Sequence, residues 1–249
     1  MNSSIRRNPR MPTWQLRLLR GRPGSSPRLE TYPVELPAEA YLIDAVEKIW
    51  AEQDRSLLFR HACHHASCGA CGVRVNGRER LMCITPLREF SPDRPIRVEP
   101  LRHFPWLGDL LVDVSPMMRR MAEVGFAIIR RDELTADRPL PEGIEQGTRF
   151  EDCIECGLCL SACPVMAADE DYLGPATLAA IERMLSEPRD RDAARLLALA
   201  DDPHGAWRCH SAMECTAVCP SNVDPASAIG RLRRWLIAEK LRRWFGGGR

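Results

Sequence analysis

Eleven cysteines give this chain its chemical character, and they fall into three groups along the sequence. Because eleven is an odd number, they cannot all form disulfide pairs. Arg6 and Arg7 near the N-terminus are not followed by the apolar segment of an export signal, so we expect a reducing compartment. Clustered cysteines in such a compartment more often bind metal or carry out redox chemistry. The cysteines therefore favour metal or iron–sulfur centres over a disulfide framework.

The first group begins in the stretch CHHASCGAC and follows a C-x4-C-x2-C-x11-C pattern: Cys63, Cys68, Cys71 and Cys83. This is the spacing of plant-type 2Fe–2S proteins. Two sulfide-bridged irons need four thiolates from one tight loop and a nearby strand, and Gly69 and Gly72 let the backbone fold closely. Structural zinc prefers two well-separated C-x2-C-type halves, and only one is present. The group predicts a 2Fe–2S cluster.

Two histidines inside this group, His64 and His65, leave a narrower alternative open. In Rieske centres, two histidines replace two of the cysteine ligands. Because four cysteines are already available at the right spacing, we expect the histidines to be loop residues. One of them would donate a hydrogen bond toward the cluster and tune its potential.

The second group, in CIECGLCLSACP, is a complete C-x2-C-x2-C-x3-C-P run: Cys153, Cys156, Cys159 and Cys163, followed by Pro164. This run is typical of bacterial ferredoxins, in which the fourth cysteine ligates the neighbouring cluster. The group therefore predicts a 4Fe–4S cluster and one ligand of a second cluster.

The third group, in CHSAMECTAVCP, lacks one cysteine of the same pattern: Ala212 stands where the second thiolate would be. A cubane corner without a thiolate readily loses its iron, so we expect a 3Fe–4S cluster. A 4Fe–4S cluster with water or a side chain at the open corner is the alternative. Exchange of the fourth ligands gives the 4Fe–4S set Cys153, Cys156, Cys159 and Cys219, and the 3Fe–4S set Cys163, Cys209 and Cys215.

The elements that position the first group are mostly strands. Residues 13–20 and 30–36 have the composition of two hairpin strands, and residues 38–53 have apolar residues at helical spacing. Asn76-Gly77 predicts a two-residue hairpin turn, because both positions tolerate a positive φ. Residues 95–100 predict a last short strand. This order is that of a β-grasp ferredoxin, which we assign to residues 12–107.

The sequence of the second half of the chain has the patterns of helices. Helices are expected over residues 116–129, 174–185, 191–200 and 225–244, and residues 130–148 form a loop rich in charge and proline. We place the domain boundary near residues 104–116 and assign residues 108–249 to an all-α domain like a bacterial ferredoxin. The fold class is therefore α+β.

The overall charge argues against a nucleic-acid partner. Lysine and arginine number 35 and aspartate and glutamate 34, so no basic field is present. No run of about 18 apolar residues occurs, so no segment is expected to span a bilayer.

The cluster order 2Fe–2S, 4Fe–4S, 3Fe–4S resembles that of the iron–sulfur subunits of succinate dehydrogenase and quinol:fumarate reductase. The resemblance extends from about Thr13 to about Leu241. It includes stretches without cluster ligands as well as the cysteine motifs: NGRERLMC, FPWLGDLLVD, LGPATLAA and WRCHSAMECTAVCP…VDPASAI.

This resemblance implies a heteromeric, membrane-bound succinate:quinone oxidoreductase. A flavoprotein subunit with covalent FAD would lie against the 2Fe–2S domain. The helical domain would rest on membrane-anchor subunits, with or without haem, at the cytoplasmic face of the cell membrane. The 3Fe–4S cluster would lie next to a quinone. The chain itself would carry electrons and hold no catalytic residue. A menaquinol-driven fumarate reductase is the alternative, because both directions use the same relay.

The resemblance also points to residues at the quinone: Pro164, Arg208 and His210, with Trp207 as a further candidate. Many relatives carry a tryptophan after the first CP pair, and this chain has Ala168 there. The first cysteine loop has Ala66 where relatives often have glycine, which implies a slightly different loop. We expect the basic C-terminal segment from Arg231 to pack on its domain and to present arginines to a partner subunit.

Overall fold

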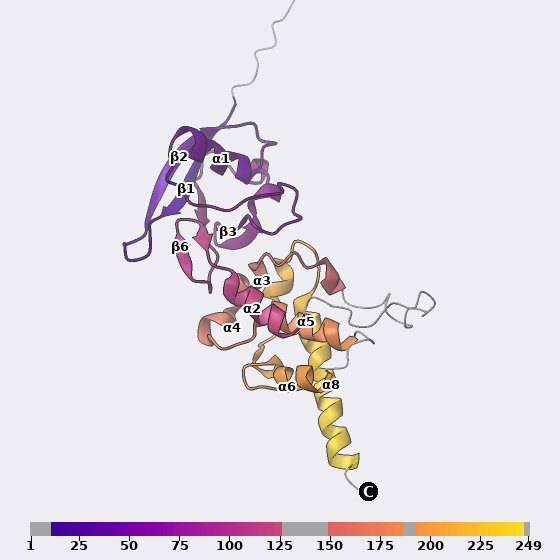
Figure 1. Ribbon diagram of the computed structural model, residues 1–249. Coiled ribbons are helices and arrows are strands. Elements are labelled where there is room, and N and C mark those ends of the chain that lie inside the picture. The colour runs from indigo at the N-terminus through magenta and orange to yellow at the C-terminus, as the bar shows by residue number, and fades with distance from the viewer. Residues whose placement is uncertain (1–10, 126–148, 187–192, 247–249) are drawn as a thin grey trace, which may run out of the picture. The chain divides into compact units, whose positions relative to one another are not determined.

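The computed structural model describes residues 11–125, 149–186 and 193–246. The chain divides into two compact units. The first runs to Pro100 and also takes in Trp106–Leu111, and the second consists of Leu101–Pro105 and the chain from Val112 onward. The first unit is rich in strands and the second is helical (Figure 1). Parts of the helix expected over 116–129, and the whole loop expected over 130–148, lie outside the described residues.

A five-stranded sheet forms the first unit, in the order β2-β1-β5-β3-β4. Strands β1 and β5 pair in parallel, and the other pairs are antiparallel. Alternate residues of β1 are buried, as period-2 side-chain geometry requires. The strands are β1 (Thr13–Arg20), β2 (Arg28–Glu35), β3 (Gly72–Val75), β4 (Arg78–Leu81) and β5 (Ile96–Glu99). The predicted strands and the hairpin turn at Asn76-Gly77 are all present.

Helix α1 (Leu42–Glu52) packs against β2 and against the 3-10 turn η1 (Met82–Ile84). Its buried face consists of Leu42, Ile43, Ala45, Val46 and Ile49. The helix begins four residues later than expected, because the Ala40 N–H donates to the Pro37 carbonyl in a preceding turn. A second 3-10 turn, η2 (Leu87–Glu89), follows η1.

A two-stranded hairpin that the sequence did not predict follows the sheet: β6 (Trp106–Gly108) and β7 (Leu111–Val112). Asp109 at its turn is fully buried and pairs with the Arg20 side chain. It also accepts hydrogen bonds from the N–H groups of Gly21 and Leu58, each at 2.8 Å. One buried carboxylate thereby joins the end of β1, the segment after α1 and this hairpin.

Helix α5 (Gly174–Ser186) is the centre of the second unit and is buried over most of its length. It packs against α2 (Ser115–Glu123), α3 (Leu158–Ala162), α6 (Ala193–Ala200) and α8 (Pro225–Gly246). The remaining elements are η4 (Arg149–Asp152), α4 (Pro164–Ala168), η5 (Ala206–Arg208) and α7 (Glu214–Ala217). Over the residues that the structure describes, no helix is both long enough and apolar enough to cross a bilayer.

Candidate iron–sulfur centres

The first cysteine loop wraps its backbone around the predicted ligands. The N–H groups of Ser67 and Cys68 both lie 3.3 Å from the Cys63 Sγ, and the N–H of Ala66 lies 3.4 Å from the Cys83 Sγ. Ala66 has a left-handed backbone with a φ of 59°, a conformation that glycine adopts more readily. Amides that point at sulfur stabilise thiolates, which is what an iron–sulfur centre needs.

The four thiols of this loop lie in two interacting pairs. A hydrogen bond from the His65 backbone, together with the thiol of Cys68, lowers the pKa of Cys63 to about 6. Burial raises the pKa of Cys71 to about 12, and the neighbouring Cys83 thiol adds to this effect. Thiols this close together favour a shared positive ion, because metal coordination removes their protons.

Neither histidine of the loop directs its side-chain contacts to a thiol among the described residues. The His65 Nδ1 contacts the Cys63 carbonyl oxygen. The His64 Nε2 lies 3.0 Å from Glu47 and 3.0 Å from His61. The ring of His64 is thus engaged with α1, a contact that the sequence did not predict.

The second cysteine run leads into two short helices. Gly157 begins α3 with a φ of 78°, and a Cβ there would come within 2.8 Å of the Phe104 ring. Only glycine fits this position, because it combines a left-handed backbone with a close approach. Cys159 lies on α3, and Cys163 lies at the junction of α3 and α4. Two thiols of the run, those of Cys159 and Cys163, are therefore positioned by the short helices.

Electrostatic interactions link the remaining seven thiols to one another. The Cys219 thiol raises the pKa of the three nearby thiols in the second run, where burial has the larger effect: Cys153 to about 11, Cys156 to about 12 and Cys159 well above its usual value. Cys163 interacts in the same way with Cys209 and Cys215. The Cys215 thiol also raises the pKa of Cys159, so the second and third cysteine groups lie close to each other.

The set of Cys163, Cys209 and Cys215 lines a small apolar cavity. Ala212 is also part of its wall, at the position where the cysteine pattern is incomplete. A backbone amide, that of Ser211, lies 3.3 Å from the Cys209 Sγ. The cavity thus offers three thiols and a methyl group, which suits a cluster that lacks one corner.

Tyr172 adds a polar group to this cavity that the sequence did not reveal. Its side chain is fully buried, and its hydroxyl has no hydrogen-bond partner among the described residues. Burial, followed by the nearby thiols of Cys209 and Cys163, raises the pKa of this hydroxyl. A buried hydroxyl without a partner is costly, so this group fits a site where cluster sulfurs would accept a hydrogen bond from it.

The four residues expected at the quinone are divided between two environments. Pro164 and His210 line the cavity of the third cysteine group, and both are exposed, as is Ala212. Trp207 and Arg208 point their polar groups elsewhere: the Trp207 Nε1 donates to Asp201 at 2.6 Å, and the Arg208 Nε donates to Asp169 at 2.8 Å. The cavity therefore reaches the surface beside Pro164 and His210.

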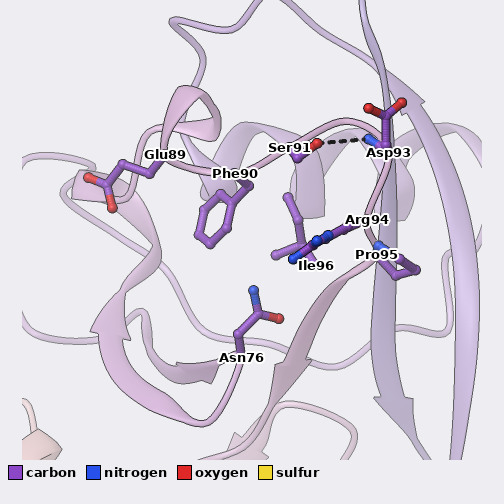
Figure 2. A pocket seen from close by; sticks show the side chains of 8 residues that line it. All are labelled: Asn76, Glu89, Phe90, Ser91, Asp93, Arg94, Pro95 and Ile96. Atoms are coloured by element: carbon purple, nitrogen blue, oxygen red, sulfur yellow. Dashed lines mark hydrogen bonds between the residues drawn. The ribbon is translucent and has the colours of Figure 1, made fainter.

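A larger surface pocket of about 570 Å³ lies in the first unit, around the β3–β4 turn and the loop before β5. Figure 2 shows the side chains that line it: Asn76, Glu89, Phe90, Ser91, Asp93, Arg94, Pro95 and Ile96. None of these residues is a predicted ligand, so we assign the pocket no part in the cluster sites.

Comparison with protein families defines the class of protein. The model of a 2Fe-2S iron-sulfur cluster binding domain matches residues 15–119, and that of a 4Fe-4S dicluster domain matches residues 149–223. The chain is therefore a two-domain iron–sulfur protein with 2Fe–2S and 4Fe–4S domains.

Comparison with individual proteins narrows this class. The chain is 38% identical to a fumarate reductase iron-sulfur subunit of Mycobacterium tuberculosis over 90% of this chain and 93% of the relative. It is 32% identical to the succinate dehydrogenase iron-sulfur subunit of Paracoccus denitrificans over 86% and 83%. A chain of the Mycobacterium smegmatis Sdh1 complex superposes with a TM-score of 0.80 at 27% identity, over 93% of this chain and 98% of that one. The protein belongs to the family of iron–sulfur subunits of succinate dehydrogenase and fumarate reductase, which are oxidoreductase complexes.

Proposed function

We propose that this subunit carries three clusters and links a flavin to a quinone in a membrane-bound succinate:quinone oxidoreductase. When bound, the clusters supply a series of one-electron carriers. The observation that carries the proposal is the cavity lined by Cys163, Cys209 and Cys215, in which Ala212 stands in place of a fourth thiol.

Each set has its own ligand assignment. The 2Fe–2S cluster would be held by Cys63, Cys68, Cys71 and Cys83. The sulfurs of Cys63 and Cys83 accept backbone N–H groups of the tight loop. The 4Fe–4S cluster would be held by Cys153, Cys156, Cys159 and Cys219. The 3Fe–4S cluster would be held by Cys163, Cys209 and Cys215, with Tyr172 donating toward it.

The two units correspond to two domain types in this proposal. Residues 12–107 would form a β-grasp ferredoxin domain, which is supported by the mixed sheet with α1 packed against it. Residues 108–249 would form a helical domain like a bacterial ferredoxin, which is supported by the short helices that carry its cysteines.

The quinone is proposed to bind beside Pro164 and His210, because both are exposed at the cavity of the third cysteine group. The partners would be a flavoprotein subunit with FAD and membrane-anchor subunits, with the chain held peripherally at the cytoplasmic face of the cell membrane. The similar Mycobacterium smegmatis chain is part of a complex, which supports a multi-subunit assembly for this one.

The direction of the reaction has two candidates. Succinate oxidation with quinone as acceptor is the first, and menaquinol-driven fumarate reduction is the second. Relatives with both names match at similar identity. Assays of the purified complex with ubiquinone and menaquinone analogues, in both directions, separate the two.

Electron paramagnetic resonance of the purified complex tests the cluster content. We expect a 3Fe–4S signal in the oxidised state and 2Fe–2S and 4Fe–4S signals after reduction with dithionite. Metal analysis that finds zinc and no iron in the cysteine sites would overturn the proposal.

Substitution Ala212→Cys tests the third site separately. A fourth thiol at this corner should convert the 3Fe–4S centre to a 4Fe–4S centre, with loss of the oxidised 3Fe–4S signal. An unchanged spectrum would mean that residue 212 is not at the open corner.

A further inference from the structure

A separate set of metal-ligating side chains lies between α1 and the first cysteine loop: Glu47, His61 and His64. We propose that these three residues bind a divalent transition-metal ion, such as Zn²⁺, in addition to the iron–sulfur clusters. This proposal rests on the geometry of the three side chains and does not depend on the direction or the partners of the electron relay.

The three potential ligand atoms converge on one point. The Glu47 Oε1 lies 2.8 Å from the His61 Nδ1 and 3.0 Å from the His64 Nε2, and the two ring nitrogens lie 3.0 Å apart. Three ligands at right angles around a metal, at about 2.0–2.1 Å, are separated from each other by about 2.8–3.0 Å. The observed triangle therefore has the dimensions of one face of an octahedral site, and its sides would lengthen by roughly 0.4 Å around a tetrahedral ion such as Zn²⁺.

Hydrogen bonds can satisfy two sides of this triangle but not all three at once. Each imidazole nitrogen carries at most one proton, and a carboxylate only accepts. If both histidines donate to Glu47, the two ring nitrogens are left 3.0 Å apart with no hydrogen bond between them. If one histidine accepts from the other, its lone pair faces the carboxylate. A cation removes the conflict, because all three atoms can direct a lone pair at it.

The chemistry of the donor set favours a transition metal. Two imidazole nitrogens and one carboxylate oxygen suit Zn²⁺, Fe²⁺ and similar divalent ions, whereas Mg²⁺ and Ca²⁺ prefer oxygen alone. Three protein ligands leave coordination positions for water. His61 and His64 are exposed, so an ion can reach them from solvent.

The charge around Glu47 permits a cation. Over the part of the chain that the structure describes, no lysine or arginine lies within ion-pair distance of this carboxylate, and its neighbour Lys48 pairs with Glu52. A second group in the helical unit, Asp169, Asp171 and His204, has similar donors. There the Arg208 guanidinium already lies 2.8 Å from Asp169, so a positive charge occupies that place.

Helix α1 positions Glu47, and the segment that leads into the first cysteine loop positions the two histidines. Glu47 projects from α1, whose opposite face is buried against the sheet and η1. The His61 ring stacks on Phe59, with ring centroids 5.0 Å apart. His64 has a left-handed backbone with a φ of 61°, which is uncommon outside glycine. A bound ion would tie the loop that contains Cys63 to α1.

Zinc binding to the chain with its clusters in place tests this site. The protein is treated with EDTA, dialysed against micromolar Zn²⁺, and analysed for zinc and iron by mass spectrometry. We expect one zinc per chain in the wild type, and at least tenfold weaker binding in Glu47→Gln and His61→Gln. Glu52→Gln is the matched control on the same helix and should bind zinc as the wild type does.

X-ray absorption spectroscopy at the zinc K-edge identifies the atoms that coordinate the ion. Nitrogen and oxygen at about 2.0–2.1 Å, without sulfur at about 2.3 Å, would support the site. A sulfur shell, equal binding by Glu47→Gln, or no zinc in the wild type would overturn it. Unchanged iron content keeps this outcome distinct from a failure of the cluster assignments, which would appear as missing iron.

Discussion

Tyr172 contributes a buried, uncharged hydroxyl beside the thiols of the third cysteine group. A hydrogen bond donated to an iron–sulfur centre stabilises the reduced form, which carries more negative charge. Removing this donor should therefore make the centre harder to reduce.

Substitution Tyr172→Phe is expected to lower the midpoint potential of the 3Fe–4S centre by about 20–60 mV, the equivalent of one hydrogen bond for a one-electron couple. A redox titration followed by electron paramagnetic resonance measures this shift. Tyr32→Phe is the control, because the Tyr32 hydroxyl donates to Glu30 in the other unit. Equal potentials in Tyr172→Phe and the wild type would contradict the role of the hydroxyl.

The ion pair between His204 and Asp169 should make the stability of the helical unit depend on pH. A hydrogen bond to the Asp169 carboxylate raises the pKa of His204 above its usual value of 6.5. A raised pKa in the folded state means that the stabilisation is complete below about pH 6.5 and is lost as the pH rises through the folded value. The thermal midpoint of the wild type should therefore exceed that of His204→Gln at pH 6, and the difference should shrink by pH 8.5. A difference that does not change with pH would exclude this pair as its source.

Site residues could be predicted from the sequence where the chemistry of a cluster fixes the spacing of its ligands along the chain. All eleven cysteines follow known ligand patterns, so their grouping could be predicted before the fold was known. Tyr172 and Glu47 follow no such pattern: Tyr172 lies nine positions after Cys163, and Glu47 lies on a helix well before His61. Only the packing of distant segments brings them to these sites.

At the scale of elements, Asp109 joins segments that are far apart in the chain. Its carboxylate is fully buried and pairs with Arg20, which is 5% exposed. Because a buried ion that loses its partner is costly, such contacts are sensitive to small changes.

Asp109→Asn is expected to destabilise the strand-rich unit by roughly 3 kcal/mol, because the Arg20 guanidinium loses a buried counter-charge. Hydrogen exchange of the β1 amides, followed by mass spectrometry, measures the change in local unfolding free energy. Asp93→Asn, in the exposed loop before β5, should leave exchange unchanged. Wild-type protection in Asp109→Asn would show that the remaining partners of Arg20 suffice.

Most elements could be predicted from local patterns, since strand alternation, the Asn76-Gly77 turn and helical spacing are all local signals. The β6–β7 hairpin could not, because its strands are two or three residues long and depend on the buried Asp109. The sheet order was equally hidden, since the parallel pairing of β1 with β5 joins residues about eighty positions apart.

At the scale of the whole molecule, the two cysteine runs of the helical unit are proposed to exchange ligands. Cys219→Ser is expected to change the 4Fe–4S signal although Cys219 lies in the third run, because the Cys219 thiol is close enough to raise the pKa of Cys153 and Cys156. Cys163→Ser should change the 3Fe–4S signal although it lies in the second run. Electron paramagnetic resonance of the two variants, compared with the wild type, checks the exchange. The reverse pattern, with each substitution affecting the cluster of its own run, would rule it out.

The parallel pairing of β1 with β5 also governs the order in which the strand-rich unit can fold during synthesis. Leu16 pairs with Ile96, so β1 leaves the ribosome long before its parallel partner exists. Translation proceeds at about 5–20 residues per second, so β1 and β2 wait several seconds as a lone hairpin with an open edge. All four thiols of the first group emerge within this interval, before the sheet that supports them is complete. The sheet that supports these thiols is therefore complete only after β5 has been released.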